Sequence, residues 1–342
     1  MTLLSSESPM NPVDIVSRGW ALYSQHFKRY AVISLRATAW SFVPAIALLA
    51  VVIILAVIHQ QILTVIQQQD FEALSDPELL GEFPGAYRNL VGWAALAIPA
   101  WLVLLFYCVA QSFGEYAAIS RLAYNTLRNL EETPQAALRF TRSRKFSFLK
   151  VSLLQGLIIF GVYLSALVLM LLIFGLVYLG GLSISTGDSP AVNTGLMVLL
   201  SLLLIAVIVG AIFAVVWLIV RIMLTEQPLA IETASGAIAA IKRSWQLTHR
   251  HVWRSFLVVL LVYAITLGLT MAIFTASQFI GLFVLGLGFL IPGTLAEVTF
   301  TLISVVIQVI LTLLPTVLIA PLWRTCLTTL YFDLGNYGQP SQ

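Results

Sequence analysis

Charged residues are scarce in this sequence. Only 10% of its 342 residues are Asp, Glu, Lys or Arg, and 60% are hydrophobic, whereas a soluble domain usually carries about 25% charged residues. Four stretches contain no charge at all: 151–187, 189–220, 255–296 and 298–323. Each exceeds the roughly 20 residues that cross the hydrocarbon layer of a bilayer as a helix. The composition therefore excludes a soluble globular domain, and the unbroken apolar runs exclude a transmembrane barrel.

Cysteine is also scarce, and common catalytic motifs are absent. The two cysteines, Cys108 and Cys326, are too few for a disulfide framework or a zinc site. Neither a GxxxxGKS/T phosphate-binding loop nor an HExxH metal-binding helix occurs. His249 and His251 are two residues apart, so on a helix their side chains diverge and cannot share a metal ion. We therefore expect no enzymatic activity, no metal, no cofactor and no nucleic-acid partner.

Apolar helix is what the sequence has in abundance. We predict an all-α polytopic membrane protein, a single integral membrane domain over residues 1–342 with about six transmembrane helices. By the length criterion the spans are Ala39–Ile58, Leu90–Val109, Leu153–Val177, Leu196–Val220, Leu257–Phe279 and Leu302–Trp323. Residues 277–293 either extend the fifth helix with a kink or form a re-entrant or interfacial segment. Residues 59–88 begin by prolonging the first helix and continue as SDPELLGEFPG, which predicts turns.

The distribution of Lys and Arg predicts the orientation of these spans. One side collects nearly all of these residues, whereas the opposite side has only Arg88. The opposite side instead carries acidic residues, namely Asp70, Glu72, Asp76, Glu78, Glu82 and Asp188. Because cytoplasmic loops are enriched in Lys and Arg, both termini are expected in the cytoplasm. The expected location is the cell (cytoplasmic or inner) membrane, or an equivalent internal membrane, as a multi-pass protein.

Two basic and aromatic segments resemble each other. RGWALYSQHFKRY (18–30) aligns without a gap with RSWQLTHRHVWRS (243–255). In each, apolar residues line one side of a helix and cations the other, which predicts an amphipathic helix lying flat on the cytoplasmic surface. A weaker third copy places Glu132-Thr133 on Glu232-Thr233. We predict three repeat-like units, approximately 12–120, 121–220 and 221–334, each an interfacial helix followed by a transmembrane hairpin.

The last third of the chain resembles a known family. PLAIETASGAIAAIKRSWQLT (228–248) and LTTLYFDL (327–334), with Tyr331 and Asp333, are similar to the glycerophosphoryl diester phosphodiesterase membrane-domain family. The resemblance implies a multispanning helical domain that is sometimes fused to a phosphodiesterase barrel. This sequence has no His-Arg-Gly motif and no soluble stretch that could hold such a barrel. The enzymatic activity in the family's name is therefore not implied here.

The candidate site residues are charged and aromatic. Lipid-headgroup contacts are predicted for Arg18, Arg29, Arg139, Arg142, Lys145, Arg243, Arg250 and Arg254. Interfacial anchors are predicted for Trp20, Trp245 and Trp253. Arg36 and Glu115 stand near the cytoplasmic ends of the first two spans, at matched depth, which predicts an intramembrane ion pair. The competing interpretation of the cations is that they only set the topology.

These observations favour a non-enzymatic integral membrane protein that organises lipid or scaffolds a membrane complex. The expected partners are membrane lipids, including anionic ones, and a membrane protein or a second copy of this chain. The alternative is a transporter or lipid-translocating protein with a site between the hairpins. A membrane-embedded enzyme is the third class, and it lacks a catalytic set in this sequence.

Overall fold

The computed structural model describes residues 10–68, 79–184, 190–232, 236–289 and 294–337. Within these ranges the chain forms ten helices and no strand. Six helices contain a stretch long and apolar enough to cross a membrane. They are α2 (Phe27–Gln68), α3 (Leu79–Leu127), α5 (Lys145–Ile184), α6 (Pro190–Ile222), α9 (Val252–Phe289) and α10 (Thr294–Tyr337). The predicted class, an all-α polytopic membrane protein, is confirmed.

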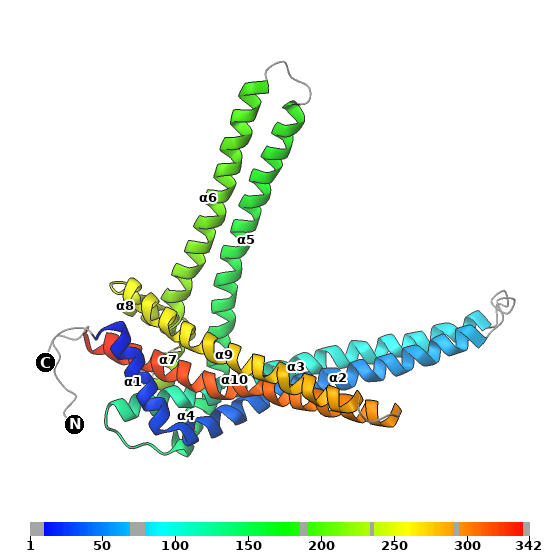
Figure 1. Ribbon diagram of the computed structural model, residues 1–342, viewed down its shortest axis with the longest axis horizontal. Coiled ribbons are helices and arrows are strands. Elements are labelled where there is room, and N and C mark those ends of the chain that lie inside the picture. The colour runs from blue at the N-terminus through cyan, green and yellow to red at the C-terminus, as the bar shows by residue number, and fades with distance from the viewer. Residues whose placement is uncertain (1–9, 69–78, 185–189, 233–235, 290–293, 338–342) are drawn as a thin grey trace.

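The long helices pair as three hairpins, α2–α3, α5–α6 and α9–α10. Four short helices complete the described chain: α1 (Pro12–Gln25), α4 (Pro134–Ser143), α7 (Glu226–Ile231) and α8 (Ala237–Thr248). The short helices gather where the hairpins meet, and α5–α6 points away from the other two (Figure 1). A short helix precedes each hairpin, which is the element order of the predicted units. The relation of these units as repeats stays a prediction.

The basic and aromatic segments, predicted as continuous surface helices, are interrupted. His26 separates α1 from α2, and residues 249–251 separate α8 from α9. Next to the second break, α8 is held to α6. The hydroxyl of Ser244 donates to the backbone carbonyl of Arg221 at 2.8 Å and ties α8 to the end of α6. The hydroxyl of Thr248 donates to the carbonyl of Ser244 at 2.9 Å and lies 3.4 Å from that of Arg221. The second part of each segment therefore begins a long helix.

The far ends of two hairpins differ in part from expectation. As predicted, α2 continues to Gln68 and prolongs the first helix. The predicted turns are wrong from Leu79 onward, because α3 begins there. Pro84, the sixth residue of α3, gives up one intrahelical hydrogen bond, and the helix continues past it. Residues 277–289 extend α9, the first of the two alternatives. Residues 69–78 and 290–293 lie outside the described part of the chain.

The hydrophobic core lies where the hairpins meet. Tyr30, Ile119 and Leu330 come from three different long helices, belong to one cluster and are at most 1% exposed. Farther along the hairpins the apolar side chains are open. Leu172 of α5 and Phe213 of α6 are 62% and 61% exposed. Apolar surface of this extent is typical of contact with lipid or with another apolar surface, which agrees with a membrane protein.

Helix α1 packs closely against α10 at Gly19. A Cβ placed on Gly19 would lie 2.7 Å from the Sγ of Cys326 and 2.8 Å from its Cα. Nearby, the hydroxyl of Tyr23 donates to the backbone carbonyl of Leu318 at 2.9 Å. Burial raises the pKa of this phenol, so the hydroxyl stays protonated, and a hydrogen-bond donor, at a higher pH than an exposed tyrosine. The first short helix is thus fixed to the last long helix.

Replacing Gly19 should loosen this contact. We expect Gly19→Ala to destabilise the protein by about 1–3 kcal/mol, because the added methyl group meets backbone atoms of α10 that cannot move alone. Thermal unfolding in detergent measures the effect. Gly156→Ala on α5 is the matched control, because no atom lies within 4 Å of the added Cβ there. Equal unfolding temperatures for the two variants would contradict the close packing of α1 on α10.

Candidate functional site

The charged side chains that the structure describes gather at one end of the molecule. We call this end, made of α1, α4, α7, α8 and the adjoining ends of the long helices, the basic end. Six arginines pair with five carboxylates there: Arg36 and Arg142 with Glu115, Arg121 with Glu132, Arg243 with Glu232, Arg254 with Asp333, and Arg324 with Glu226. Most of the acidic side chains at the basic end are therefore already neutralised inside the protein.

Glu115 of α3 is the most deeply buried of these carboxylates, with 0% of its side chain exposed. Arg36 donates through Nε to Oε2 at 2.7 Å, and Arg142 donates through Nη2 to Oε1 at 2.7 Å. The indole N–H of Trp40 donates to Oε1 at 3.2 Å. The predicted contact between Arg36 and Glu115 is present. Arg142, predicted to contact lipid headgroups, turns towards the same carboxylate, so the cluster joins α2, α3 and α4.

Glu132 precedes α4 and is held on both its side chain and its backbone. Arg121 donates through Nε to both carboxylate oxygens, at 2.8 and 3.0 Å, and Asn125 donates at 2.5 Å. The guanidinium of Arg29 donates to the backbone carbonyl of Glu132. Arg29, another predicted headgroup contact, is therefore engaged through one nitrogen with the chain ahead of α4.

Glu232 precedes α8 and is held in a similar way. The hydroxyl of Tyr331 donates to its carboxylate at 2.5 Å, and Arg243 lies 3.7 Å from it. Arg144 donates to its backbone carbonyl at 2.7 Å. The side chain of Arg243, predicted to face headgroups, is 41% exposed, so it also keeps contact with the surroundings.

These contacts follow one another around the basic end. Arg29, after α1, binds the residue before α4, and Arg144, after α4, binds the residue before α8. Arg254, after α8, pairs with Asp333, whose other carboxylate oxygen accepts from the backbone N–H of Met10, before α1, at 3.2 Å. These three contacts thus fix the chain ahead of α4, α8 and α1, and the succession closes on itself. Arg254 is directed into the protein, contrary to its predicted position in an outward cationic stripe.

The other predicted headgroup residues are placed differently. Arg18, Arg139 and Arg250 are exposed and form no salt bridge with a carboxylate that the structure describes. Lys145 donates to the side-chain oxygen of Gln111 at 3.2 Å and lies 4.1 Å above the ring of Tyr107. Its ammonium group is therefore held by the protein.

The three predicted tryptophan anchors differ in exposure. Trp20 and Trp253 are 44% and 70% exposed. Trp245 packs edge-on against Trp217, with ring centroids 5.3 Å apart, and the guanidinium of Arg221 lies 4.9 Å from each ring. Trp20 and Trp253 therefore present their rings to the surroundings, whereas the ring of Trp245 packs within the protein. The sequence pattern did not indicate Arg221 as the partner of Trp245.

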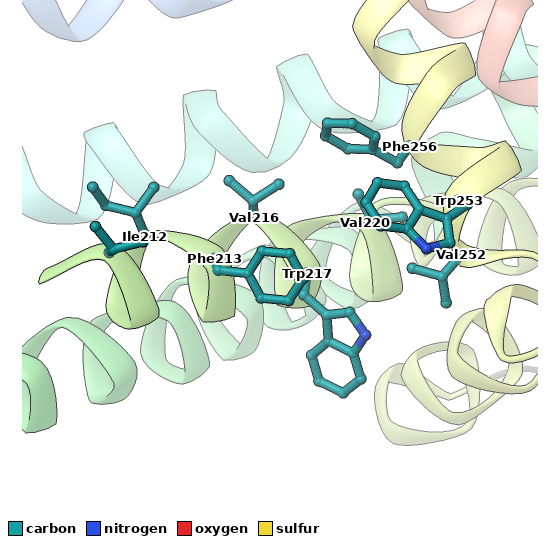
Figure 2. Close-up of a pocket in the computed structure, with 9 residues that line it drawn as sticks. Ile212, Phe213, Val216, Trp217, Val220, Val252, Trp253 and Phe256 are labelled. Carbon is teal, nitrogen blue, oxygen red and sulfur yellow. The ribbon is translucent and has the colours of Figure 1, made fainter. Parts of the chain in front are cut away.

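An apolar groove lies between α6 and the start of α9 (Figure 2). Its volume is about 450 Å³, and it is lined by Val209, Ile212, Phe213, Val216, Trp217, Val220, Val252, Trp253 and Phe256. In Figure 2 the side chains of α6 form a row that leads to Val252, Trp253 and Phe256 on α9. No acidic or basic side chain lines this groove, so it is suited to hydrocarbon.

The chain matches no protein-family model, no curated protein and no solved structure. The resemblance to the glycerophosphoryl diester phosphodiesterase membrane-domain family therefore stays a prediction. Among the residues that the structure describes, no group of three or more His, Cys, Asp or Glu is positioned to hold a metal ion.

Removing the buried carboxylate should leave two arginines without their shared partner. We expect Glu115→Gln to destabilise the protein by about 1–3 kcal/mol, at the low end for a buried pair because water reaches both guanidinium groups. Adding Arg36→Gln should restore part of this loss, since it removes one of the two orphaned charges. Unfolding free energies in mixed detergent micelles measure both effects.

The control for this pair is Glu131→Gln, which removes an exposed carboxylate that is in no salt bridge with the described residues. Its effect should stay within about 0.5 kcal/mol. Strictly additive losses for Glu115→Gln and Arg36→Gln would show that the two residues are not coupled.

Proposed function

We propose that this protein is a non-enzymatic integral membrane protein that gathers anionic lipid at the cytoplasmic surface of a cell membrane. The main observation in support is the excess of exposed cations over exposed carboxylates at the basic end. Seven cations are exposed and form no salt bridge with a described carboxylate: Arg18, Lys28, Arg128, Arg139, Lys150, Lys242 and Arg250. Only Asp14 and Glu131 are exposed acids in the described part of the basic end.

Internal pairing is the reason that this surplus persists. The other carboxylates of the basic end are engaged by arginines, and Glu115 is out of contact with solvent. They are not free to neutralise the surface cations. A cytoplasmic leaflet that contains anionic lipid supplies negative charge along the same plane, and each nearby Lys or Arg is attracted to it by about 1 kcal/mol.

The apolar features fit the same proposal. The basic end adjoins six apolar helices, which is the arrangement expected where cations face the cytoplasm. A transporter for a polar solute would need polar groups that face a cavity between the hairpins. A hollow of about 500 Å³ between α3, α9 and α10 does carry polar groups, but its one charged side chain, Arg324, is paired with Glu226. The groove between α6 and α9 presents only valine, isoleucine, phenylalanine and tryptophan side chains. Contact with lipid is therefore favoured over transport of a polar solute.

The test removes charge without removing the internal ion pairs. We expect Arg18→Gln/Lys242→Gln/Arg250→Gln to fold normally and to reduce the enrichment of phosphatidylglycerol next to each replaced cation about fivefold, which corresponds to about 1 kcal/mol per cation. The lipid composition of polymer-bounded membrane particles, extracted at low salt and analysed by mass spectrometry, measures the enrichment. The difference should shrink in 1 M salt, where the Debye length is about 3 Å.

The matched control replaces Arg18 and Arg250 with lysine and leaves Lys242 unchanged. Because this variant keeps every charge, it should retain the wild-type enrichment. If the glutamine variant retains the wild-type enrichment as well, the proposed function is wrong. A stoichiometric protein in the particles, with no enrichment of anionic lipid, would support scaffolding of a membrane complex instead.

A further inference from the structure

A second groove, between α2 and α4, combines cations with an apolar floor. It has a volume of about 440 Å³ and is lined by Lys28, Arg29, Val32, Ile33, Arg36, Pro134 and Leu138. The five residues from α2 recur at spacings of three and four, so they share one side of the helix. Lys28 and Arg36 are eight residues apart, which corresponds to about 12 Å along the helix axis. The groove therefore runs lengthwise along the first turns of α2.

The charge in this groove is not balanced by the protein. Lys28 and Arg29 form no salt bridge with a carboxylate among the described residues. Arg29 uses Nη2 for the carbonyl of Glu132, whereas its Nε is buried without a hydrogen-bond partner. Arg36 shares the single carboxylate of Glu115 with Arg142. Four cations and one carboxylate thus leave a net charge of +3 on the lining and its ion-pair partners.

The apolar floor lies between the cations. Val32 of α2 is 62% exposed, and the largely buried Leu138 of α4 belongs to the same lining. The groove also starts at the beginning of an apolar stretch, Phe27–Ile53, that is long enough to cross a membrane. A small soluble anion would satisfy the cations but would leave the floor uncovered. A phospholipid covers both, because its phosphate is joined to hydrocarbon.

We propose that this groove binds one anionic phospholipid, with the phosphate between Lys28 and Arg29 and an acyl chain along Val32 and Leu138. Arg36 stands deeper, and its Nε is occupied by Glu115, so the phosphate occupies the end near Lys28. The inference rests on the proposed function but is narrower, because it assigns a single site where the surface charge alone would give diffuse attraction.

The test counts lipids bound to the full chain by native mass spectrometry in detergent, titrated with phosphatidylglycerol. We expect Lys28→Gln/Arg29→Gln to weaken binding of the first lipid about tenfold to thirtyfold, from roughly fivefold per cation. Lys242→Gln/Arg250→Gln removes the same charge outside the groove and should affect only later, weaker binding. Val32→Gln, which keeps all charges, should also weaken the first binding event. Lys28→Gln alone, at an exposed side chain, should weaken it about fivefold.

The outcomes separate the site from the wider proposal. If both double variants weaken the first lipid equally, or if Val32→Gln has no effect, the groove site is wrong and diffuse attraction stands. If none of the charge variants alters lipid binding, the site and the proposed function both fail. Glycerol 3-phosphate should not displace the first lipid, and displacement at equal concentration would show that the groove takes a soluble phosphate. A cooperative unfolding transition without added lipid confirms that each variant is folded, and Lys28→Gln alone, which keeps the hydrogen bond of Arg29 to Glu132, should unfold at the wild-type temperature.

Discussion

A charged side chain at the edge of a hydrocarbon layer is stable only when it is paired or reaches water, and the architecture of this protein follows from that constraint. Glu115 is fully buried and holds arginines from two other helices. Arg29, Arg144 and Arg254 each reach the chain around the next short helix, in the last case through Asp333 and Met10. Ion pairs and charged hydrogen bonds thus join the hairpins where the apolar helices converge.

The spans could be predicted because a stretch of some twenty uncharged apolar residues has few alternatives to a membrane helix. The pair of Arg36 with Glu115 could be predicted because both stand at the same depth, near the cytoplasmic ends of consecutive spans. The direction of Arg29 and Arg254 could not. Breaks at His26 and at residues 249–251 move both onto the starts of long helices, and helical periodicity assumed across the break assigns them to the wrong side. The spacing of Arg121 and Glu132 recurs one hundred residues later in Arg221 and Glu232. This recurrence could have indicated that the residues ahead of α4 and α8 are held in similar ways.

Function depends on the cations that remain after the internal pairs are formed. Counting Lys and Arg in the sequence overestimates the surface charge, because six arginines are taken by carboxylates. The structure divides the predicted headgroup residues into those that join helices, such as Arg142 and Arg254, and those that stay exposed, such as Arg18 and Arg250. The same division explains why Lys28 and Arg29, beside an apolar floor, form a candidate lipid site.

The central claim is that the basic end faces the cytoplasm, and labelling with a membrane-impermeant thiol reagent tests it most directly. Both native cysteines are buried, so the background should be low. A cysteine at position 250, in the exposed connection between α8 and α9, should react only after the membrane is permeabilised. A cysteine at position 189, between α5 and α6, should react in intact cells. The reverse pattern, with position 250 labelled from outside and position 189 protected, would contradict the account.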